Sequence, residues 1–457
     1  MIKTREIDMT NGPILKNLLI CTFPLIIMNI LQLLFNAADI AIIGMFRGDD
    51  AVAAVGATSS LTGLITGLFI GFSTGANIVL AKYRGKQNAE GAKRVVGTAI
   101  CLSLIAGILL VIIGVFLAEY FLIWMGCPSD ILGMATTYLR IYLVGMPIVM
   151  LYNFLASILR AVGDTFRPMI FLMISGVLNV GLNVFFVTVC GMSVEGVAYA
   201  TVISQAVSAI CCLVVVLKSK GYCKFSIRHF RIYKREIKEI MRIGIPGGIQ
   251  SCLFSLSNVF LQSAVNALGT ATVAANAVSS QVDAIIYFIG NSIAVACMSF
   301  VSQNYGARNM DRVKKVIKIS ILVSVVGMAV VGITFALLSG YLLRILTDSQ
   351  EVIEIAKIRL YILGFSYFIC GVLDVLSLAM RALGKAITSM IICLIGSCLF
   401  RIVWINTIYH LNESFGMIYI SYPITWTITI AVICCFFIPQ VKDLERRIAQ
   451  GDMEKDL

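Results

Sequence analysis

The sequence predicts an all-α integral membrane protein with twelve transmembrane helices in two six-helix lobes, related by a parallel internal repeat. Three observations predict this fold: an apolar composition, basic residues confined to alternate connections, and a repeated pattern. Of 457 residues, 59% are hydrophobic and 13% are charged, whereas soluble domains have about 45–50% apolar and about 25% charged residues. Lipid must therefore cover most of the surface, which excludes a soluble enzyme, a disordered chain and a disulfide-stapled module.

Twelve apolar runs, separated by charged or Gly/Pro-rich breaks, approach or exceed the roughly 20 residues that one helical span requires. Lipid offers backbone N–H and C=O groups no hydrogen-bonding partners, so each run should form a helix. The expected spans are 15–43, 52–81, 95–118, 136–159, 167–190, 196–217, 241–267, 272–302, 316–338, 358–380, 386–408 and 416–439.

Positive charge falls on alternate connections between these spans. Thirty of the 36 Lys and Arg residues lie at the termini or in even-numbered connections. The odd-numbered connections hold chiefly Arg47, Arg344, Lys357 and Arg359. The positive-inside rule then predicts a multi-pass protein of the inner cell membrane with both termini in the cytoplasm. The pattern also removes nucleic-acid binding as the leading use of the charge.

The second half of the chain repeats the first at a nearly constant offset. Pro24 and Asn36 match Pro246 and Asn258, and three longer segments match in the same order: 83–96 with 304–317, 139–145 with 358–364, and 159–165 with 380–386. A six-span unit returns to its starting side, so both halves have the same orientation. The expected parts are an N-terminal lobe (1–217), a basic linker (218–240), a C-terminal lobe (241–441) and a cytoplasmic tail (442–457).

A parallel repeat of this kind is typical of transporters, which place substrate between two lobes and alternate access by rocking. An enzyme is not expected, because the sequence offers no cluster of catalytic groups. His229 and His410 are the only histidines and no CxxC pair occurs, so neither a metal site nor a cofactor is expected.

Only a few ionisable residues lie deep in the expected spans: the acids Asp39, Asp283 and Asp374 and the base Arg401. A charge inside the membrane is costly and marks a functional site by default. We expect Arg401 to pair with Asp283 or Asp374, and the remaining acid to contact a cationic substrate. The sequence does not decide which of the two acids is paired.

Asp39 is the leading candidate for cation coupling. Together with Asn29, Gln32 and Asn36 it forms one polar helical face, which should line a cavity. No base lies deep in spans one to six, so this carboxylate should be protonated easily or meet a cation. Pro24 removes a backbone donor on the same helix; it is either a hinge whose bend follows Asp39 protonation or a static kink.

A second polar face lies on the fifth span, where Ser175, Asn179 and Asn183 are spaced four residues apart. Such spacing places the three side chains on one side of a helix. We expect Asn179 and Asn183 to line the same cavity as Asp39. The alternative is plain hydrogen bonding between neighbouring helices.

The segments LRAVGDTFRPM (159–169) and YRGKQNAEGAKR (83–94), with Pro24 fifteen residues before Asp39, resemble the MATE (multidrug and toxic compound extrusion) exporters. The resemblance covers nearly the whole chain. It implies twelve helices in two lobes and cation-driven efflux of amphipathic organic cations across the lipid bilayer. Asn183 stands where proton-coupled members carry an Asp. Ser255 and Cys370 replace acids of the sodium-coupled NorM branch, which favours the DinF-like, proton-coupled side.

The expected function is therefore secondary active multidrug export by antiport, working as a monomer, with protons as the coupling ion and sodium left open. One alternative is a flippase or exporter of a lipid-linked or other amphipathic metabolite, although deep bases for its phosphates are nearly absent. A membrane enzyme and a channel are less favoured, because catalytic clusters are lacking and the two-lobe repeat is typical of carriers.

Overall fold

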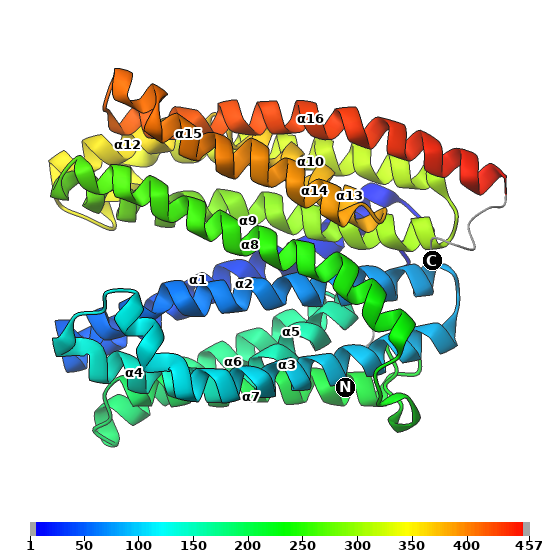
Figure 1. Cartoon of the computed structure of the whole chain (residues 1–457), viewed down its shortest axis with the longest axis horizontal. Coiled ribbons are helices and arrows are strands. Elements are labelled where there is room, and N and C mark those ends of the chain that lie inside the picture. Colours follow the sequence, from blue (N-terminus) through cyan, green and yellow to red (C-terminus); the bar gives the residue numbers. More distant parts are fainter. Residues whose placement is uncertain (1–5, 451–457) are drawn as a thin grey trace. The chain divides into compact units, whose positions relative to one another are not determined.

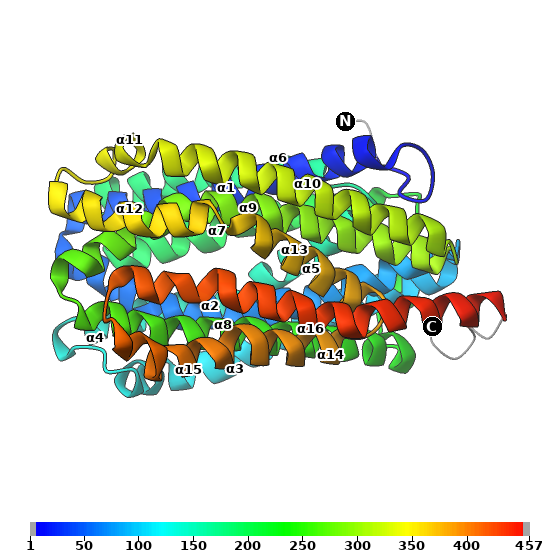
Figure 2. The ribbon, with the colours of Figure 1, turned by 90° about the horizontal axis from the view of Figure 1, so that it is seen from above.

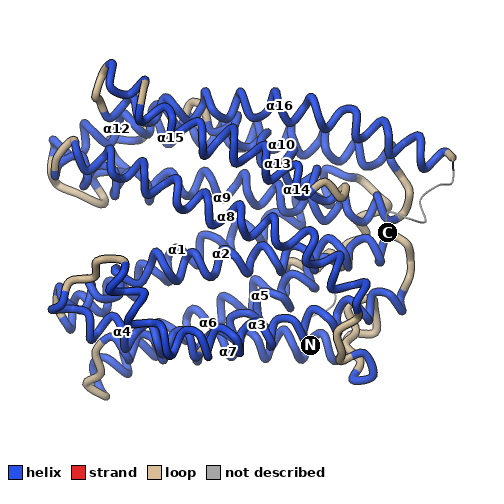
Figure 3. The backbone as a smooth tube through the Cα atoms, viewed as in Figure 1, coloured by secondary structure: helices blue, strands red, loops and turns tan. Residues whose placement is uncertain are grey.

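The computed structural model describes residues 6–450, and within that part the chain is helical and contains no strand (Figures 1 and 3). This confirms the all-α class. The α-helices are α1 Ile14–Arg47, α2 Asp49–Gly85, α3 Ala89–Trp124, α4 Ser129–Val144, α5 Met146–Ala161, α6 Phe166–Val184, α7 Val194–Lys218, α8 Lys234–Ala267, α9 Thr270–Gly306, α10 Met310–Leu337, α11 Ser339–Arg344, α12 Gln350–Gly364, α13 Tyr367–Ala382, α14 Ala386–Cys393, α15 Phe400–Asn406 and α16 Phe415–Ala449. Short π segments extend α6 and join α14 to α15.

Each of the twelve expected spans corresponds to a helix or to a pair of helices. Among the described residues, nine spans are long and apolar enough to cross a membrane, and two more are bent helix pairs. The twelfth is α8, which carries more polar residues than the others.

The fourth and tenth spans are not single helices, which corrects the expectation of one helix for each run. The pairs α4–α5 and α12–α13 each bend by 48°, and the second bend can be followed in Figure 2. The first break precedes Pro147, which lacks a backbone N–H. At each break a glycine of the preceding long helix approaches the backbone closely: Gly107 meets Pro147, and Gly332 meets Gly364.

The chain forms two compact units, and each unit includes a helix segment from the other half of the sequence. One unit contains Phe23–Gly248 with the residues up to Ile7; the other contains Asp8–Thr22 and the residues from Ile249 onward. The boundaries fall beside Pro24 in α1 and Pro246 in α8. The ranges 1–217 and 241–441 remain the predicted lobes, and this exchange was not anticipated. The expected tail overlaps the end of α16, and residues 451–457 lie outside the described part.

Local geometry reproduces the repeat at the start of α3 and of α10. Asn88 and Asn309 cap these helices by accepting hydrogen bonds from Gly91 N and Arg312 N, at 2.8 and 3.0 Å. The preceding residues, Gln87 and Arg308, have positive φ angles of 57° and 59°. The matched segments therefore share a turn and a cap as well as sequence.

Close packing of α2 against the first part of α8 depends on glycine. A Cβ added to Gly75 would lie 2.4 Å from the carbonyl oxygen of Ile240, whereas one added to Gly63 would meet nothing within 4 Å. We therefore expect Gly75→Ala to lower the thermal unfolding midpoint, because backbone cannot give way as a flexible side chain can. Gly63→Ala, on the same helix, is the matched control and should leave the midpoint unchanged. Equal midpoints for the two variants would contradict this packing.

The turn before α1 is organised by Asp8, whose carboxylate accepts hydrogen bonds from the Thr10 backbone N and hydroxyl at 2.8 and 2.6 Å and from Asn11 Nδ2 at 2.9 Å. Partial burial raises the pKa of Asp8, but these hydrogen bonds outweigh it and lower the pKa from 3.8 to about 2. The turn docks through Arg312, whose Nη2 donates to the Asn11 and Gly12 carbonyls at 2.9 and 2.8 Å.

A depressed carboxyl pKa stabilises the folded turn above the unfolded pKa, and the stabilisation is lost as the pH falls through the folded value. Protection of the Thr10 amide from hydrogen–deuterium exchange, corrected for intrinsic rates, should therefore be constant from pH 7 to 5. It should fall between pH 3.8 and about 2. In Asp8→Asn this pH dependence should vanish; an unchanged profile would contradict the assignment.

Candidate functional site

The expected coupling residue, Asp39, lies on α1 beside the polar face of α6. Its carboxylate accepts a short hydrogen bond from Asn183 Nδ2. The same amide nitrogen lies 3.4 Å from Asn179 Oδ1, and Asn179 Nδ2 lies 3.5 Å from the Thr201 hydroxyl on α7. The structure thus brings Asp39, Asn179 and Asn183 together and adds Thr201, so that a chain of polar groups joins three helices of one unit.

No basic residue of the described chain forms an ion pair with Asp39, and its polar neighbours are the Asn183 amide and the Thr201 hydroxyl. Asn179 and Asn183 are 5% and 0% exposed. The Asn183 Oδ1 atom is buried without a hydrogen-bond partner. A carboxylate held by neutral groups beside an unused acceptor can exchange a proton or meet a cation without first breaking a salt bridge.

Two other residues of the expected α1 face, Gln32 and Asn36, do not join this polar chain. Gln32 and Asn36 are exposed on the surface of the helix, whereas Asp39 is partly buried. Pro24 is buried inside α1, next to the boundary between the two units. The polar face of α1 therefore has two parts. The end with Asp39 packs on α6, whereas the end with Gln32 and Asn36 is exposed.

Asp283 is paired, but not with Arg401, so that part of the expectation was wrong. Arg359 on α12 donates to Asp283 Oδ2 from both Nε and Nη2, each at 2.8 Å. The two side chains are 11% and 5% exposed. Charge alternation had assigned Arg359 to an external connection, although it lies just inside the tenth expected span. The repeat could have shown this position, because the matching residue Arg140 lies inside the fourth expected span.

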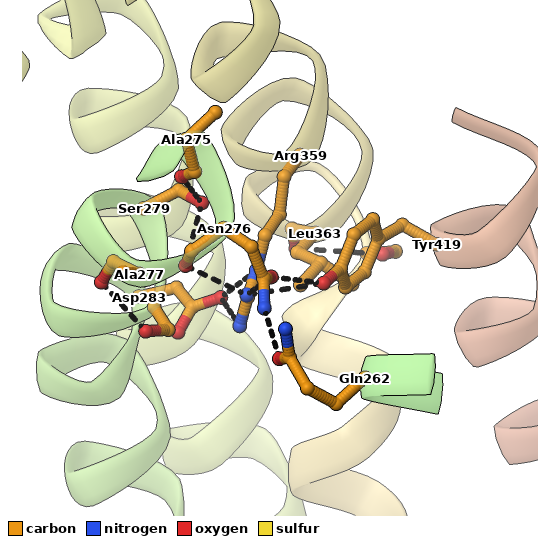
Figure 4. A network of polar contacts seen from close by, with 11 residues as sticks. Gln262, Ala275, Asn276, Ala277, Ser279, Asp283, Arg359, Leu363 and Tyr419 are labelled. Carbon is orange, nitrogen blue, oxygen red and sulfur yellow. Dashed lines mark hydrogen bonds and ion pairs between the residues drawn. The ribbon is translucent and has the colours of Figure 1, made fainter. Parts of the chain in front are cut away.

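This ion pair belongs to a polar network that crosses four helices (Figure 4). Arg359 Nη1 donates to Asn276 Oδ1 and lies 3.2 Å from the Tyr419 hydroxyl, which also donates to Asn276 Oδ1. Asn276 Nδ2 donates in turn to Gln262 Oε1 at 2.8 Å. The guanidinium also lies over the Tyr419 ring, 4.6 Å from its centroid. The network ties α8, α9, α12 and α16 together.

Arg401 is held by aromatic rings rather than by an acid. Its guanidinium lies 3.8 Å from the centroid of the Tyr422 ring and 6.0 Å from that of Trp426. Its Nε lies 3.4 Å from the Thr425 hydroxyl. The residue is 3% exposed. Stacking on electron-rich faces offsets part of the cost of burying the cation, so Arg401 is not the counter-ion of either acid.

Asp374 on α13 is consequently the acid that is left without an ion-pair partner. Its Oδ2 atom is buried and accepts no hydrogen bond. Its ionisable neighbours are Tyr287, Cys370, Cys393 and Arg381, and the Arg381 guanidinium donates to Gln250 Oε1. Of the two acids in the second half, Asp374 is therefore the one with spare capacity for a cation.

Residues 6–450 contain no group of three or more His, Cys, Asp or Glu side chains that could hold a metal ion. The site consists instead of three acids on separate helices, partly or fully buried, in a bundle of two six-span repeats. That combination defines a membrane transport protein. A family model described as MatE matches residues 24–185 and again 246–407, so the chain belongs to the MatE family. The two matches start at Pro24 and Pro246 and confirm the internal repeat.

Several named proteins are similar over most of their length. "Probable multidrug resistance protein YoeA" of Bacillus subtilis is 29% identical over 91% of each chain. "Probable multidrug resistance protein NorM" of Thermotoga maritima is 26% identical over 83% of this chain and 82% of that protein. "Multidrug export protein MepA" of Staphylococcus aureus is 22% identical over 93% and 92%.

Solved structures share the fold. A structure described as the "outward-facing conformation of a multidrug resistance MATE family transporter of the MOP superfamily" superposes with a TM-score of 0.89 at 22% identity, over 98% of this chain and 100% of that one. A MATE crystal structure "in the bent conformation" gives 0.91, and one "in the straight conformation" gives 0.90, both at 22% identity; they cover 98% and 97% of this chain and 100% of theirs. The twelve-helix, two-lobe class is thus confirmed, and the fold matches structures solved in more than one conformation.

Proposed function

We propose that this MatE protein exports amphipathic organic cations in exchange for protons, by alternating access between its two lobes. The observation that carries the proposal is Asp39, an intramembrane carboxylate held by Asn183 rather than by a base. The names of the similar proteins, multidrug resistance and multidrug export, support this substrate class.

Antiport follows from the inability of one carboxylate to hold a proton and an organic cation together. In the ionised state, Asp39 accepts the Asn183 N–H and attracts a cation that enters from the cytoplasm. Protonation from outside removes the negative charge and with it the attraction, so the cation leaves outward. The return step carries the proton inward. Asn179 and Thr201 keep Asn183 in place during both states.

Protons are favoured over sodium because the Asn183 atom that faces Asp39 is an N–H donor and not an oxygen ligand. One carboxylate is enough to take up a proton, whereas a hard cation is held by several oxygen ligands. Ser255 and Cys370 also lack the charge of the acids that they replace. This pattern supports a position on the DinF-like side of the family.

The remaining assignments extend the same mechanism. Within its own unit, Asp374 offers a contact for a cationic substrate, and Gln32 and Asn36 offer polar contacts on the exposed part of α1. Pro24 acts as the hinge through which α1 changes its bend when Asp39 is protonated. We place the protein in the inner cell membrane with both termini in the cytoplasm, where it works as a monomer.

The test is transport by the purified protein in vesicles of uniform orientation, with a fluorescent organic cation as substrate. A proton gradient and a sodium gradient are imposed separately at the same membrane potential. The expected result is dye movement driven by the proton gradient, together with release of protons from acid-loaded vesicles when dye is added. Dye movement driven only by the sodium gradient would overturn the assignment of protons as the coupling ion. No dye movement under either gradient, together with movement of a fluorescent lipid, would overturn the substrate class.

A further inference from the structure

The connection between α7 and α8 has an unusual surface. Residues 218–235, here called the basic linker segment, contain no acid. Their exposed bases are Lys218, Lys220, Lys224, Arg228, Arg231, Lys234 and Arg235. Of these, only Arg235 forms an ion pair with an acid in the described part of the chain, 3.8 Å from Glu239. Most of this positive charge is therefore available to a partner outside the chain.

Large apolar side chains lie among these bases. Ile227 is 83% exposed, Phe230 is 47% exposed and Ile232 is 42% exposed. Leaving three such side chains in water is unfavourable, because apolar surface is stabilised when it is removed from water. Both ends of the segment continue into transmembrane helices, so the three side chains lie within reach of lipid. Exposed Lys and Arg side chains beside exposed bulky apolar side chains are the combination that holds a segment at a membrane interface.

The segment is not a loose loop, because its backbone and His229 contact the first turns of α3. His229 Nε2 lies 2.7 Å from Glu90 Oε1, and this hydrogen bond lowers the pKa of the Glu90 carboxyl. The Tyr233 backbone N donates to the Thr98 hydroxyl at 3.3 Å. A Cβ added to Gly97 would lie 1.9 Å from the His229 carbonyl oxygen. The close contact fixes the backbone, so the exposed side chains are displayed on a rigid support.

We infer that the basic linker segment binds the anionic phospholipid headgroups of the adjoining membrane surface, with Ile227, Phe230 and Ile232 inserted at the boundary between headgroups and acyl chains. The charge is complementary to phosphatidylglycerol-type lipids and gives no preference for zwitterionic ones. Each base beside an anionic surface changes binding by about fivefold. This inference depends on the membrane fold and not on the substrate or coupling ion.

The test places a fluorescent reporter on the segment. Phe230→Trp protein is reconstituted into bilayers in which either phosphatidylglycerol or phosphatidylcholine carries brominated chains, at equal mole fraction. The emission of the parent protein, which has three Trp residues, is subtracted. We expect stronger quenching by the brominated anionic lipid. Salt at about 1 M, where the Debye length is about 3 Å, should remove the difference.

Two triple variants in the reporter background separate local from general charge effects. Lys220→Gln/Lys224→Gln/Arg228→Gln removes three bases from the segment. In this variant, quenching by brominated phosphatidylglycerol should fall to the level of quenching by brominated phosphatidylcholine. The matched control, Arg308→Gln/Lys315→Gln/Lys318→Gln, removes three exposed bases near the start of α10 and should keep the preference.

Equal quenching by both lipids in the reporter protein would overturn the inference, and so would equal loss in both triple variants. Absence of quenching by either lipid would show that Phe230 faces water and would also overturn it. Elution of every variant at the position of the parent in size-exclusion chromatography checks that it folds. The assay measures no transport, so its outcome is independent of the proposed exporter function.

Discussion

Replacing Asp39 by Asn is expected to reduce proton-driven dye efflux to the leak rate of protein-free vesicles. The change preserves size and hydrogen-bonding capacity but removes the only titratable group in the polar chain formed with Asn183 and Asn179. Without a proton to exchange, the site has no means to couple the gradient to the dye. Release of protons upon dye addition should disappear in the same variant.

Dye binding separates lost coupling from lost folding. Asp39→Asn should still bind the fluorescent cation, with lower affinity because a charge is missing, and should elute as the parent protein does. Asp49→Asn makes the same chemical change at an exposed acid at the start of α2 and should transport normally. Proton-driven efflux that persists in Asp39→Asn would move the coupling site to Asp374.

Replacing Arg359 by Gln should give the largest loss of stability among the substitutions considered. Removing one partner of a buried ion pair leaves an uncompensated charge and costs about 3–5 kcal/mol. Here Asp283, 5% exposed, would lose both Arg359 contacts. The thermal unfolding midpoint should fall strongly in Arg359→Gln and in Asp283→Asn. The double variant should recover much of the loss, because two neutral amides can hydrogen-bond each other.

The repeat supplies a control for this experiment. Arg140 matches Arg359 in sequence, but it pairs with Glu119 at 3.4 Å with side chains that are 45% and 50% exposed. An exposed pair of this kind is worth about 0–1 kcal/mol. Arg140→Gln should therefore leave the midpoint nearly unchanged. Equal shifts in Arg140→Gln and Arg359→Gln, or additive losses in the double variant, would contradict the role given to burial.

Apolar runs were sufficient to predict the spans, because lipid imposes one length and one kind of secondary structure on each of them. They could not reveal the bends within the fourth and tenth spans. Gly145 and Pro147 lie inside an uninterrupted apolar run, and Gly364 and Phe365 interrupt theirs no more visibly. Hydrophobicity reports where a segment lies and not whether its helix continues.

Helical spacing predicted the polar faces that carry Asp39 on α1 and Asn179 and Asn183 on α6, since each set repeats along one side of its helix, and the structure places these side chains together. Thr201 was missed because a lone Thr in a helix usually bonds to its own backbone, as it also does here with the Val197 carbonyl at 2.9 Å. Arg359 was misassigned because charge counting treats a residue near a span end as part of a connection. Which base pairs with which acid depends on helix rotation, which the sequence does not encode directly.

Because α1 and α8 each contribute residues to both units, the two halves of the chain depend on one another. Residues 14–22 complete the unit built mainly from the second half, and residues 234–248 complete the other. A cut within the connection after α7 would give two fragments, each carrying a helix end that belongs to its counterpart. Such fragments should be recovered only when they are co-produced, as in a domain-swapped dimer in which each copy lends its partner an element.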